Sequence, residues 1–257
     1  MGTFLPSSDI DVAVTVRSLR PKRASPDRFN QAAWLANLRR RLVNTPDCGF
    51  TVVEFRKSAK EPLLIIRDVA TQIEMDINCG CNEIGHNGLE RSLWIVSQLP
   101  TYKNLVALVV ILKDLLRLNV LSDVRSGGFS SYVLTLMVLG FLQRGNNNRN
   151  LNLGDLLLKC LKFYGSDFDF TNNAIVVTDG GKIISKKDMQ AMVKEPIEQG
   201  PYLCIQQPTD PAMDAAKSSC KGTPAVQEAF RRTYDRLMGM VGTSAVNGKD
   251  ILHTAFA

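Results

Sequence analysis

Apolar residues in the first third of the chain alternate with polar ones or form short β-branched runs, which is typical of strands. Four strands are predicted, at residues 9–16, 50–55, 63–67 and 73–77. Between the first two, residues 29–42 carry apolar side chains at helical spacing, with arginines on the other faces. We therefore expect a small α/β module that ends near Asn87-Gly88, a pair typical of turns.

From residue 89 onward, the apolar residues follow the i, i+3, i+4, i+7 spacing of amphipathic helices. Helices are predicted at residues 101–119, 132–143, 153–163 and 223–240. Ser130 and Ser131 follow a Gly-Gly break and can cap the second of these helices. Residues 175–184, with Asp179-Gly180-Gly181 in the middle, are typical of a short hairpin. Two modules are expected, residues 1–88 and residues 89–257, the second mainly helical.

The composition agrees with a folded protein of this kind. Of the 257 residues, 45% are apolar and 22% are charged, which argues against wholesale disorder and leaves room for two cores. The formal net charge is +6, with cations clustered around Arg17 to Arg28 and at Arg39-Arg40-Arg41. This charge pattern favours an anionic partner without identifying it.

Cysteine spacing and hydropathy exclude other classes of protein. The six cysteines are scattered without a disulfide framework, which favours a reducing compartment. Cys79, Cys81 and His86 have no fourth ligand nearby and do not match common zinc spacings. The longest apolar stretch, residues 132–142, is much shorter than the ~20 residues that span a bilayer, so no membrane partner is expected.

Three aspartates form the strongest candidate site. Asp9 and Asp11 share one face of the first predicted strand, and Asp76 lies on the fourth, on the same face as Glu74. If these two strands pair, the three carboxylates meet at one edge of the sheet, where hard oxygen ligands suit Mg²⁺ or Mn²⁺. The alternative is that Asp9 and Asp11 are an ordinary solvated strand end, as most Asp-x-Asp pairs are.

Four motifs occur in an order that covers most of the chain. They lie at residues 5–11, 112–132, 152–168 and 207–214. They resemble, in turn, the catalytic strand of the DNA polymerase β-like nucleotidyltransferases, a helix with the family's Gly-Gly and Ser-Tyr element, the poly(A) polymerase-associated domain and its nucleotide recognition loop. The resemblance is to the TRAMP-type nuclear poly(A) polymerases and the terminal uridylyltransferases in particular.

The resemblance implies a fold. Residues 1–88 would be the α/β palm, a nucleotidyltransferase-type mixed sheet with flanking helices, and residues 89–257 the mainly helical central, poly(A) polymerase-associated domain. The family has a Gly-Ser pair about a dozen residues before the first aspartate, which holds the terminal phosphates. Only Met1-Gly2-Thr3 precedes Phe4 here. We therefore expect an N-terminally truncated palm: either the gene model starts late, or the protein is a shortened paralogue whose triphosphate site is incomplete.

The resemblance also assigns roles to individual residues. Asp9, Asp11 and Asp76 would hold two Mg²⁺ or Mn²⁺ ions, and Asp76 would take the proton from the RNA 3′ hydroxyl. Lys113 and Arg117 share a helix face and would meet the triphosphate; their alternative is a solvated basic edge.

Four further residues would bind the nucleotide. Ser131 would donate to a phosphate, and Tyr132 would stack on the base; otherwise they are a helix cap and a core aromatic. Asn87, with Asn82 as competitor, would contact the ribose. In the recognition loop, Gln206-Gln207-Pro208 replaces the common Glu-Asp-Pro, while Asp210 and Asp214 remain.

The implied function is template-independent addition of AMP from ATP to an RNA 3′ end, by a two-metal mechanism. The loop's length and its Asp-Pro-x-x-Asp pattern resemble those of the adenylyl-adding members, and the loop lacks the histidine that uridylyl-adding members often carry, so the resemblance favours ATP over UTP. Two alternatives stay open: a terminal uridylyltransferase, and an impaired truncated paralogue that acts as a binding subunit. No sequence-reading module is evident, so an RNA-binding partner protein is expected. Resemblance favours the nucleus, with the cytoplasm and mitochondria as alternatives.

Overall fold

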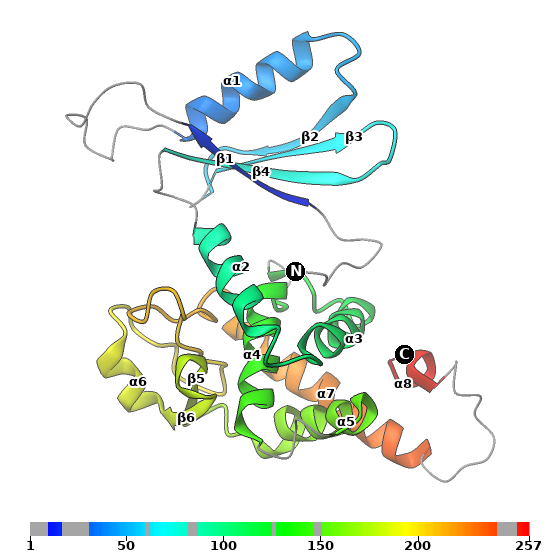
Figure 1. Ribbon diagram of the computed structural model, residues 1–257, viewed down its shortest axis with the longest axis vertical. Coiled ribbons are helices and arrows are strands. Elements are labelled where there is room, and N and C mark those ends of the chain that lie inside the picture. Colours follow the sequence, from blue (N-terminus) through cyan, green and yellow to red (C-terminus); the bar gives the residue numbers. More distant parts are fainter. Residues whose placement is uncertain are drawn as a thin grey trace. The chain divides into compact units, whose positions relative to one another are not determined.

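The computed structural model describes residues 10–16, 31–59, 62–81, 87–124, 127–145, 151–240 and 251–256. The chain divides into two compact units, the first within Phe4–Leu93 and the second from Trp94 onward (Figure 1). Helix α2 (Asn87–Gln98) contains the point of division, which therefore lies a little beyond the predicted boundary at residue 88. The predicted turn at Asn87-Gly88 is wrong, because both residues belong to the first turn of this helix.

The first unit is a mixed four-stranded sheet. Its elements are β1 (Ile10–Val16), α1 (Gln31–Asn44), β2 (Phe50–Arg56), β3 (Leu63–Asp68) and β4 (Glu74–Cys81). The strand order is β1-β4-β3-β2, with β1 parallel to β4 and the other pairs antiparallel. All four predicted strands are confirmed, apart from Asp9, which lies outside the described residues.

Helix α1 covers one face of this sheet (Figure 1). Leu35 of the helix is fully buried against Leu64, Ile66, Ile77 and Cys79 of β3 and β4. Val12 and Val14 of β1 pack on the same cluster, which fixes the face that β1 turns toward the helix. Because side chains alternate along a strand, the residues between these apolar positions are on the opposite face.

The second unit is built on helices. These are α3 (Leu105–Leu118), α4 (Ser131–Arg144), α5 (Leu153–Lys162), α6 (Lys186–Met192), α7 (Thr223–Met240) and α8 (Ile251–Phe256). Every residue of α4 from Val133 to Leu142 is buried, as expected of a helix at the centre of a domain. The four helices predicted from periodicity are confirmed to within a few residues, whereas α6 and α8 were not predicted. No helix in the described ranges is long and apolar enough to cross a membrane.

Local chemistry explains where several elements begin and turn. The Ser130 hydroxyl accepts a hydrogen bond from Val133 N (3.2 Å) and thereby caps α4, as predicted. Strands β5 (Asn173–Val176) and β6 (Lys182–Ser185) form the predicted antiparallel hairpin. Gly180 and Gly181 in its turn have φ of 64° and 71°, a left-handed conformation that favours glycine.

Helix α5 continues into one π-helical segment, Phe163–Asp167, which is closely packed. Tyr164 is fully buried, and its hydroxyl donates to Met137 O (2.6 Å) of α4. Its ring contacts Phe163, Phe168 and Phe170. Next to it, a Cβ added at Gly165 would lie 2.8 Å from Arg231 N of α7, so glycine is what allows the two backbones to approach.

We therefore predict that Gly165→Ala lowers the free energy of unfolding by about 1 to 3 kcal/mol, since the added methyl overpacks a backbone contact that cannot move freely. Gly239→Ala is the matched control, because a Cβ at Gly239 of α7 meets nothing within 4 Å. Helix propensity makes that control neutral or up to about 1 kcal/mol stabilising. Urea unfolding of both variants measures the difference, and equal values would contradict the close approach.

Candidate active site

The parallel pairing of β1 with β4 places Asp11 directly beside Asp76. Val12 and Ile77, the next residues on each strand, pack in the core beneath α1, so the two carboxylates share the opposite face of the sheet. Asp11 is exposed, and Asp76 is half-buried. The strand pairing on which the predicted site depends is therefore present for these two residues, whereas Asp9 lies outside the described residues.

The neighbours of this pair include one acidic residue that is already ion-paired and one apolar residue. Glu74 shares the face with Asp76, but its carboxylate is ion-paired with Arg67 on the neighbouring position of β3. The position beside Asp76 on β3 is Ile65, which is buried and apolar. On the two adjacent strands, Asp76 thus has another carboxylate on one side and a hydrocarbon on the other. A positive ion between Asp11 and Asp76 would relieve their mutual repulsion.

The donor atoms on this face fit a hard divalent cation. Two carboxylates from separate strands supply the oxygen ligands that Mg²⁺ and Mn²⁺ prefer. Asn78 is two residues beyond Asp76 on the same strand, and its Oδ1 is buried without a hydrogen-bond partner among the described residues. Within the described ranges, no three His, Cys, Asp or Glu side chains gather into a metal-binding group. The third predicted ligand, Asp9, is outside those ranges.

Helix α3 in the second unit carries the predicted phosphate-binding pair. Lys113 is half-buried and Arg117 is exposed, one turn apart. Arg117 donates to Asp114 Oδ1 from Nε (3.0 Å) and Nη2 (2.8 Å). Such an exposed pair is worth no more than about 1 kcal/mol, so Arg117 can exchange this partner for a phosphate at small cost.

The start of α4 is linked to the recognition loop. Ser131 is the first residue of the helix and is exposed, while Tyr132 packs partly on the core of this unit. The Tyr132 hydroxyl donates to Gln207 Oε1 (2.8 Å), and Gln207 Nε2 donates to Thr209 Oγ1 (3.2 Å). Gln207 is almost fully buried. The Gln207 amide thus fixes the position of the tyrosine hydroxyl.

Asp214 braces the recognition loop from within. Its Oδ1 accepts hydrogen bonds from Ile205 N (3.1 Å) and Ala216 N (2.9 Å). Burial raises the pKa of Asp214 above its usual value, although these two N–H groups and Cys204 favour the charged form. Asp214 therefore bonds to the backbone on both sides of itself. Asp210, by contrast, is exposed at the tip of the loop, and its Oδ1 accepts a hydrogen bond from Ala212 N (3.2 Å).

Lys186, near Asp214, is a buried charged residue that the sequence did not predict. It is 6% exposed, and its Nζ donates to Gly200 O (2.9 Å). Burial lowers the pKa of Lys186, while nearby groups that include Cys204 and Asp214 oppose that shift. A lysine in a Lys-Lys pair normally indicates a solvated surface, so no sequence signal was available.

The structure thus gathers the predicted residues in separate groups. Asp11 and Asp76 meet on the sheet of the first unit. Tyr132 and the recognition loop meet in the second unit, where Lys113 and Arg117 follow one helix face. Asn87, predicted to contact the ribose, is the first residue of α2, and its competitor Asn82 lies outside the described residues.

Tyr132→Phe is expected to destabilise the protein by about 1 to 3 kcal/mol, since it leaves the buried Gln207 Oε1 without its donor. Tyr102→Phe is the matched control, because the part of the chain that the structure describes holds no hydrogen bond from the Tyr102 hydroxyl. The control should change the free energy of unfolding by less than about 0.5 kcal/mol. Urea denaturation measures the free energy of unfolding of both variants. A Tyr132→Phe variant as stable as the parent would contradict the link between the tyrosine and the loop.

The raised pKa of Asp214 predicts a pH dependence. A carboxyl whose folded pKa exceeds its unfolded value near 3.8 stabilises fully below that value and loses this contribution as pH rises through the folded pKa. Asp214→Asn keeps an oxygen acceptor for both N–H groups and cannot ionise. The variant should therefore gain stability relative to the parent between pH 4 and 7, by about 1.4 kcal/mol for each unit by which the folded pKa exceeds the unfolded one.

Urea unfolding at several pH values measures that gain. Asp210→Asn, which changes an exposed carboxyl in the same loop, serves as the control. Its free energy of unfolding should differ from that of the parent by the same amount at every pH. If the free energies of unfolding of the parent and the Asp214→Asn variant change equally with pH across this range, the raised pKa of the carboxyl is contradicted.

Comparison with known proteins shows what this fold and these residues are similar to. Residues 152–213 match the family model described as Cid1 family poly A polymerase. The chain is 30% identical over 250 residues to the Inactive non-canonical poly(A) RNA polymerase protein Trf4-2 of Drosophila melanogaster, covering 95% of this chain and 58% of that protein. It is 32% identical over 241 residues to Poly(A) RNA polymerase cid14 of Schizosaccharomyces pombe, covering 91% of this chain but 33% of that protein.

Solved structures agree on the fold. The polymerase core of TRAMP, described as an RNA surveillance complex, superposes with a TM-score of 0.76 at 23% identity, covering 99% of this chain and 77% of that one. A structure of mtPAP in complex with UTP superposes with a TM-score of 0.66 at 18% identity, covering 96% of this chain and 59% of that one. The predicted fold class, a nucleotidyltransferase-type palm with a helical domain, is confirmed. Residues 152–213 thus match the Cid1 family of poly A polymerases, and nearly the whole chain is similar in sequence to poly(A) RNA polymerases.

Proposed function

We propose that this chain is the catalytic core of a template-independent RNA nucleotidyltransferase that adds AMP from ATP to an RNA 3′ end. The observation that carries the proposal is the Asp11–Asp76 pairing on one sheet face, in a chain that is similar to poly(A) RNA polymerases over nearly its whole length. The chain spans 58% and 33% of the two relatives described above, so the activity of those whole proteins comes to it only as a proposal.

Asp9, Asp11 and Asp76 are the residues that would hold two divalent ions, Mg²⁺ or Mn²⁺. When bound, such ions supply positive charge to the phosphates and favour ionisation of the attacking hydroxyl. Asp76 is half-buried beside the apolar Ile65, which suits a carboxylate that accepts the proton from the RNA 3′ hydroxyl.

The second unit would bind the nucleotide. Lys113 and Arg117 would meet the triphosphate, and Ser131 at the start of α4 would donate to a phosphate where helix N–H groups already favour an anion. Tyr132, whose hydroxyl is held by Gln207, would present its ring to the base. Asp210 is exposed and available to a base edge, Asn87 would contact the ribose, and Asp214 would act by bracing the loop.

The choice of nucleotide and the cellular setting are part of the same proposal. The loop pattern supports ATP over UTP, although mtPAP has been crystallised with UTP, GTP and CTP, so binding alone does not decide the substrate. The TRAMP and GLD-2/RNP-8 structures are of complexes, which supports an RNA-binding partner protein here. The similarity to the TRAMP polymerase core supports a nuclear location.

A second candidate is a binding subunit without polymerase activity. The observation in its favour is that the Drosophila relative, 30% identical to this chain, is named as inactive. The Asp11–Asp76 pair argues for the enzyme, because a subunit that only binds RNA gains nothing from two adjacent carboxylates that repel the phosphate backbone.

Primer extension tests both candidates. We expect the protein to lengthen a labelled single-stranded RNA with ATP and Mg²⁺ or Mn²⁺, and Asp76→Asn to lower the rate by at least ~10²-fold, as loss of a general base does. Glu74→Gln is the matched control, because Glu74 lies on the same strand face but is ion-paired with Arg67. This control should keep the rate within about 3-fold, well short of the loss expected at the base.

Each other result has a defined meaning. Extension with UTP in preference to ATP would assign a uridylyltransferase. No extension with any nucleotide, together with retained RNA binding, would assign the binding subunit. Equal losses in Asp76→Asn and Glu74→Gln would show that this face acts through stability rather than chemistry.

A further inference from the structure

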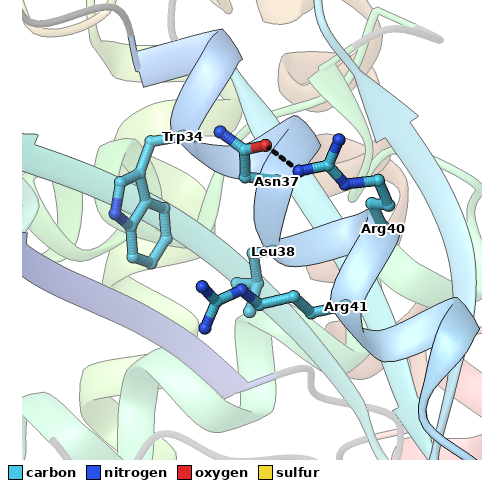
Figure 2. Close-up of a pocket in the computed structure, with 5 residues that line it drawn as sticks. All are labelled: Trp34, Asn37, Leu38, Arg40 and Arg41. Carbon is cyan, nitrogen blue, oxygen red and sulfur yellow. Dashed lines mark hydrogen bonds between the residues drawn. The ribbon is translucent and has the colours of Figure 1, made fainter.

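Helix α1 carries a pocket that the proposed active site does not use. An open pocket of about 480 Å³ lies along the helix and is lined by Trp34, Asn37, Leu38, Arg40 and Arg41 (Figure 2). The helix packs on the sheet face opposite Asp11 and Asp76. The pocket therefore lies on the other side of the sheet from the carboxylates and cannot be part of the same site.

Trp34 gives the pocket an aromatic surface. It is half-buried, packing against the core formed by Leu35 and the sheet while also lining the pocket. Trp34, Leu38 and Arg41 follow one another at i, i+4 and i+7, so they form one stripe of the helix. In Figure 2, the Arg41 side chain extends along Leu38 toward the side on which the indole lies.

The charge of the helix is wholly positive. Helix α1 contains Arg39, Arg40 and Arg41 and no acidic residue. Within the described ranges, none of these arginines forms an ion pair, and the bond from Arg40 Nη2 to Asn37 Oδ1 (2.9 Å) is to a neutral amide. Three arginines without a carboxylate among the residues of the helix give this surface a positive potential, which favours an anion.

The combination of an indole with arginines distinguishes among anionic partners. The acidic side chains of a peptide would satisfy the guanidinium groups but carry no aromatic ring to stack on a tryptophan. Single-stranded RNA supplies both, since its phosphates bind arginine and its bases stack on aromatic rings regardless of sequence. The pocket volume is in the range of sites that hold small molecules, and so is adequate for one nucleotide.

We propose that the α1 pocket binds a single-stranded stretch of RNA upstream of the 3′ end, with a base stacked on Trp34 and phosphates bound by Arg40 and Arg41. The choice of RNA rests on the proposed function. Because the carboxylates are on the opposite sheet face, an RNA in this pocket passes around the sheet before its 3′ end reaches them. The pocket thus sets RNA affinity and the shortest well-bound substrate, and leaves the chemical step unchanged.

Intrinsic fluorescence offers a direct test, because the chain has only two tryptophans, Trp34 and Trp94. In a Trp94→Phe variant, Trp34 is the sole tryptophan. Titration with an oligoadenylate in EDTA, without any nucleoside triphosphate, should quench its emission as the base stacks. No metal or turnover is involved, so this result is independent of whether the protein is an active polymerase.

Affinity measured with labelled oligoadenylate identifies the contributing side chains. Arg40→Ala and Arg41→Ala should each weaken binding several-fold and lower the slope of log affinity against log salt by about 0.7, the value for one phosphate contact on a single strand. Arg39→Ala is the matched control, with the same loss of charge on the same helix but outside the pocket lining. It should leave the slope unchanged.

Aromatic substitution completes the test while keeping the core filled. Trp34→Phe should retain most of the affinity and Trp34→Leu should lose it, with circular dichroism confirming that both fold. Equal effects of Arg39→Ala and Arg41→Ala, or unquenched emission at saturating RNA, would overturn the proposal. Quenching by polyglutamate but not by oligoadenylate would also overturn it and would assign an acidic protein partner.

Discussion

The parallel register between β1 and β4 is the constraint on which the proposed chemistry depends. Asp11 is paired with Asp76, and the alternate residues Val12 and Ile77 enter the core beneath α1. Because side chains alternate along a strand, a slip of one residue would put a carboxylate in that core and an apolar side chain on the open face. Burial of the valines and isoleucines therefore holds the two acids together, despite their mutual repulsion.

The second unit uses a different means to fix a functional surface. Its recognition loop is held by polar side chains in or near the interior: Gln206 and Gln207 are buried, and the half-buried Asp214 accepts two backbone N–H bonds. In a low-dielectric interior, such groups are costly unless they are bonded, so a loop whose bonds are satisfied has few alternative conformations. The bond between Gln207 and Tyr132 transfers this rigidity to an aromatic ring at the start of a helix.

Much of the fold could be predicted because its elements carry strong periodic signals. The buried stripe of α3, the wholly buried α4 and the paired strands all follow from apolar spacing. The Asn87-Gly88 pair gave a wrong prediction. Such a pair is typical of turns, but here it forms the first residues of an amphipathic helix. Helix α6 was missed because it has only seven residues, too few to show a period.

The candidate site was less predictable than the fold, because its contacts join residues distant in sequence. Two aspartates on predicted strands could be assigned to one face, but only the strand order shows that they are neighbours. No local pattern connects Tyr132 with Gln207, or Lys186 with Gly200. Family resemblance supplied candidate roles for such residues, whereas their contacts follow from packing that no short stretch encodes.

Helix α1 shows how one element can serve both stability and recognition. Its inward stripe, centred on Leu35, fills the core that positions β1 and β4, while its outward stripe presents arginines and part of an indole. A helix that needed only to cover the sheet would not require three consecutive arginines with no carboxylate among its residues, because their positive charges repel one another. Uncompensated charge of one sign, kept beside an aromatic surface, is better explained by an anion with planar groups than by folding.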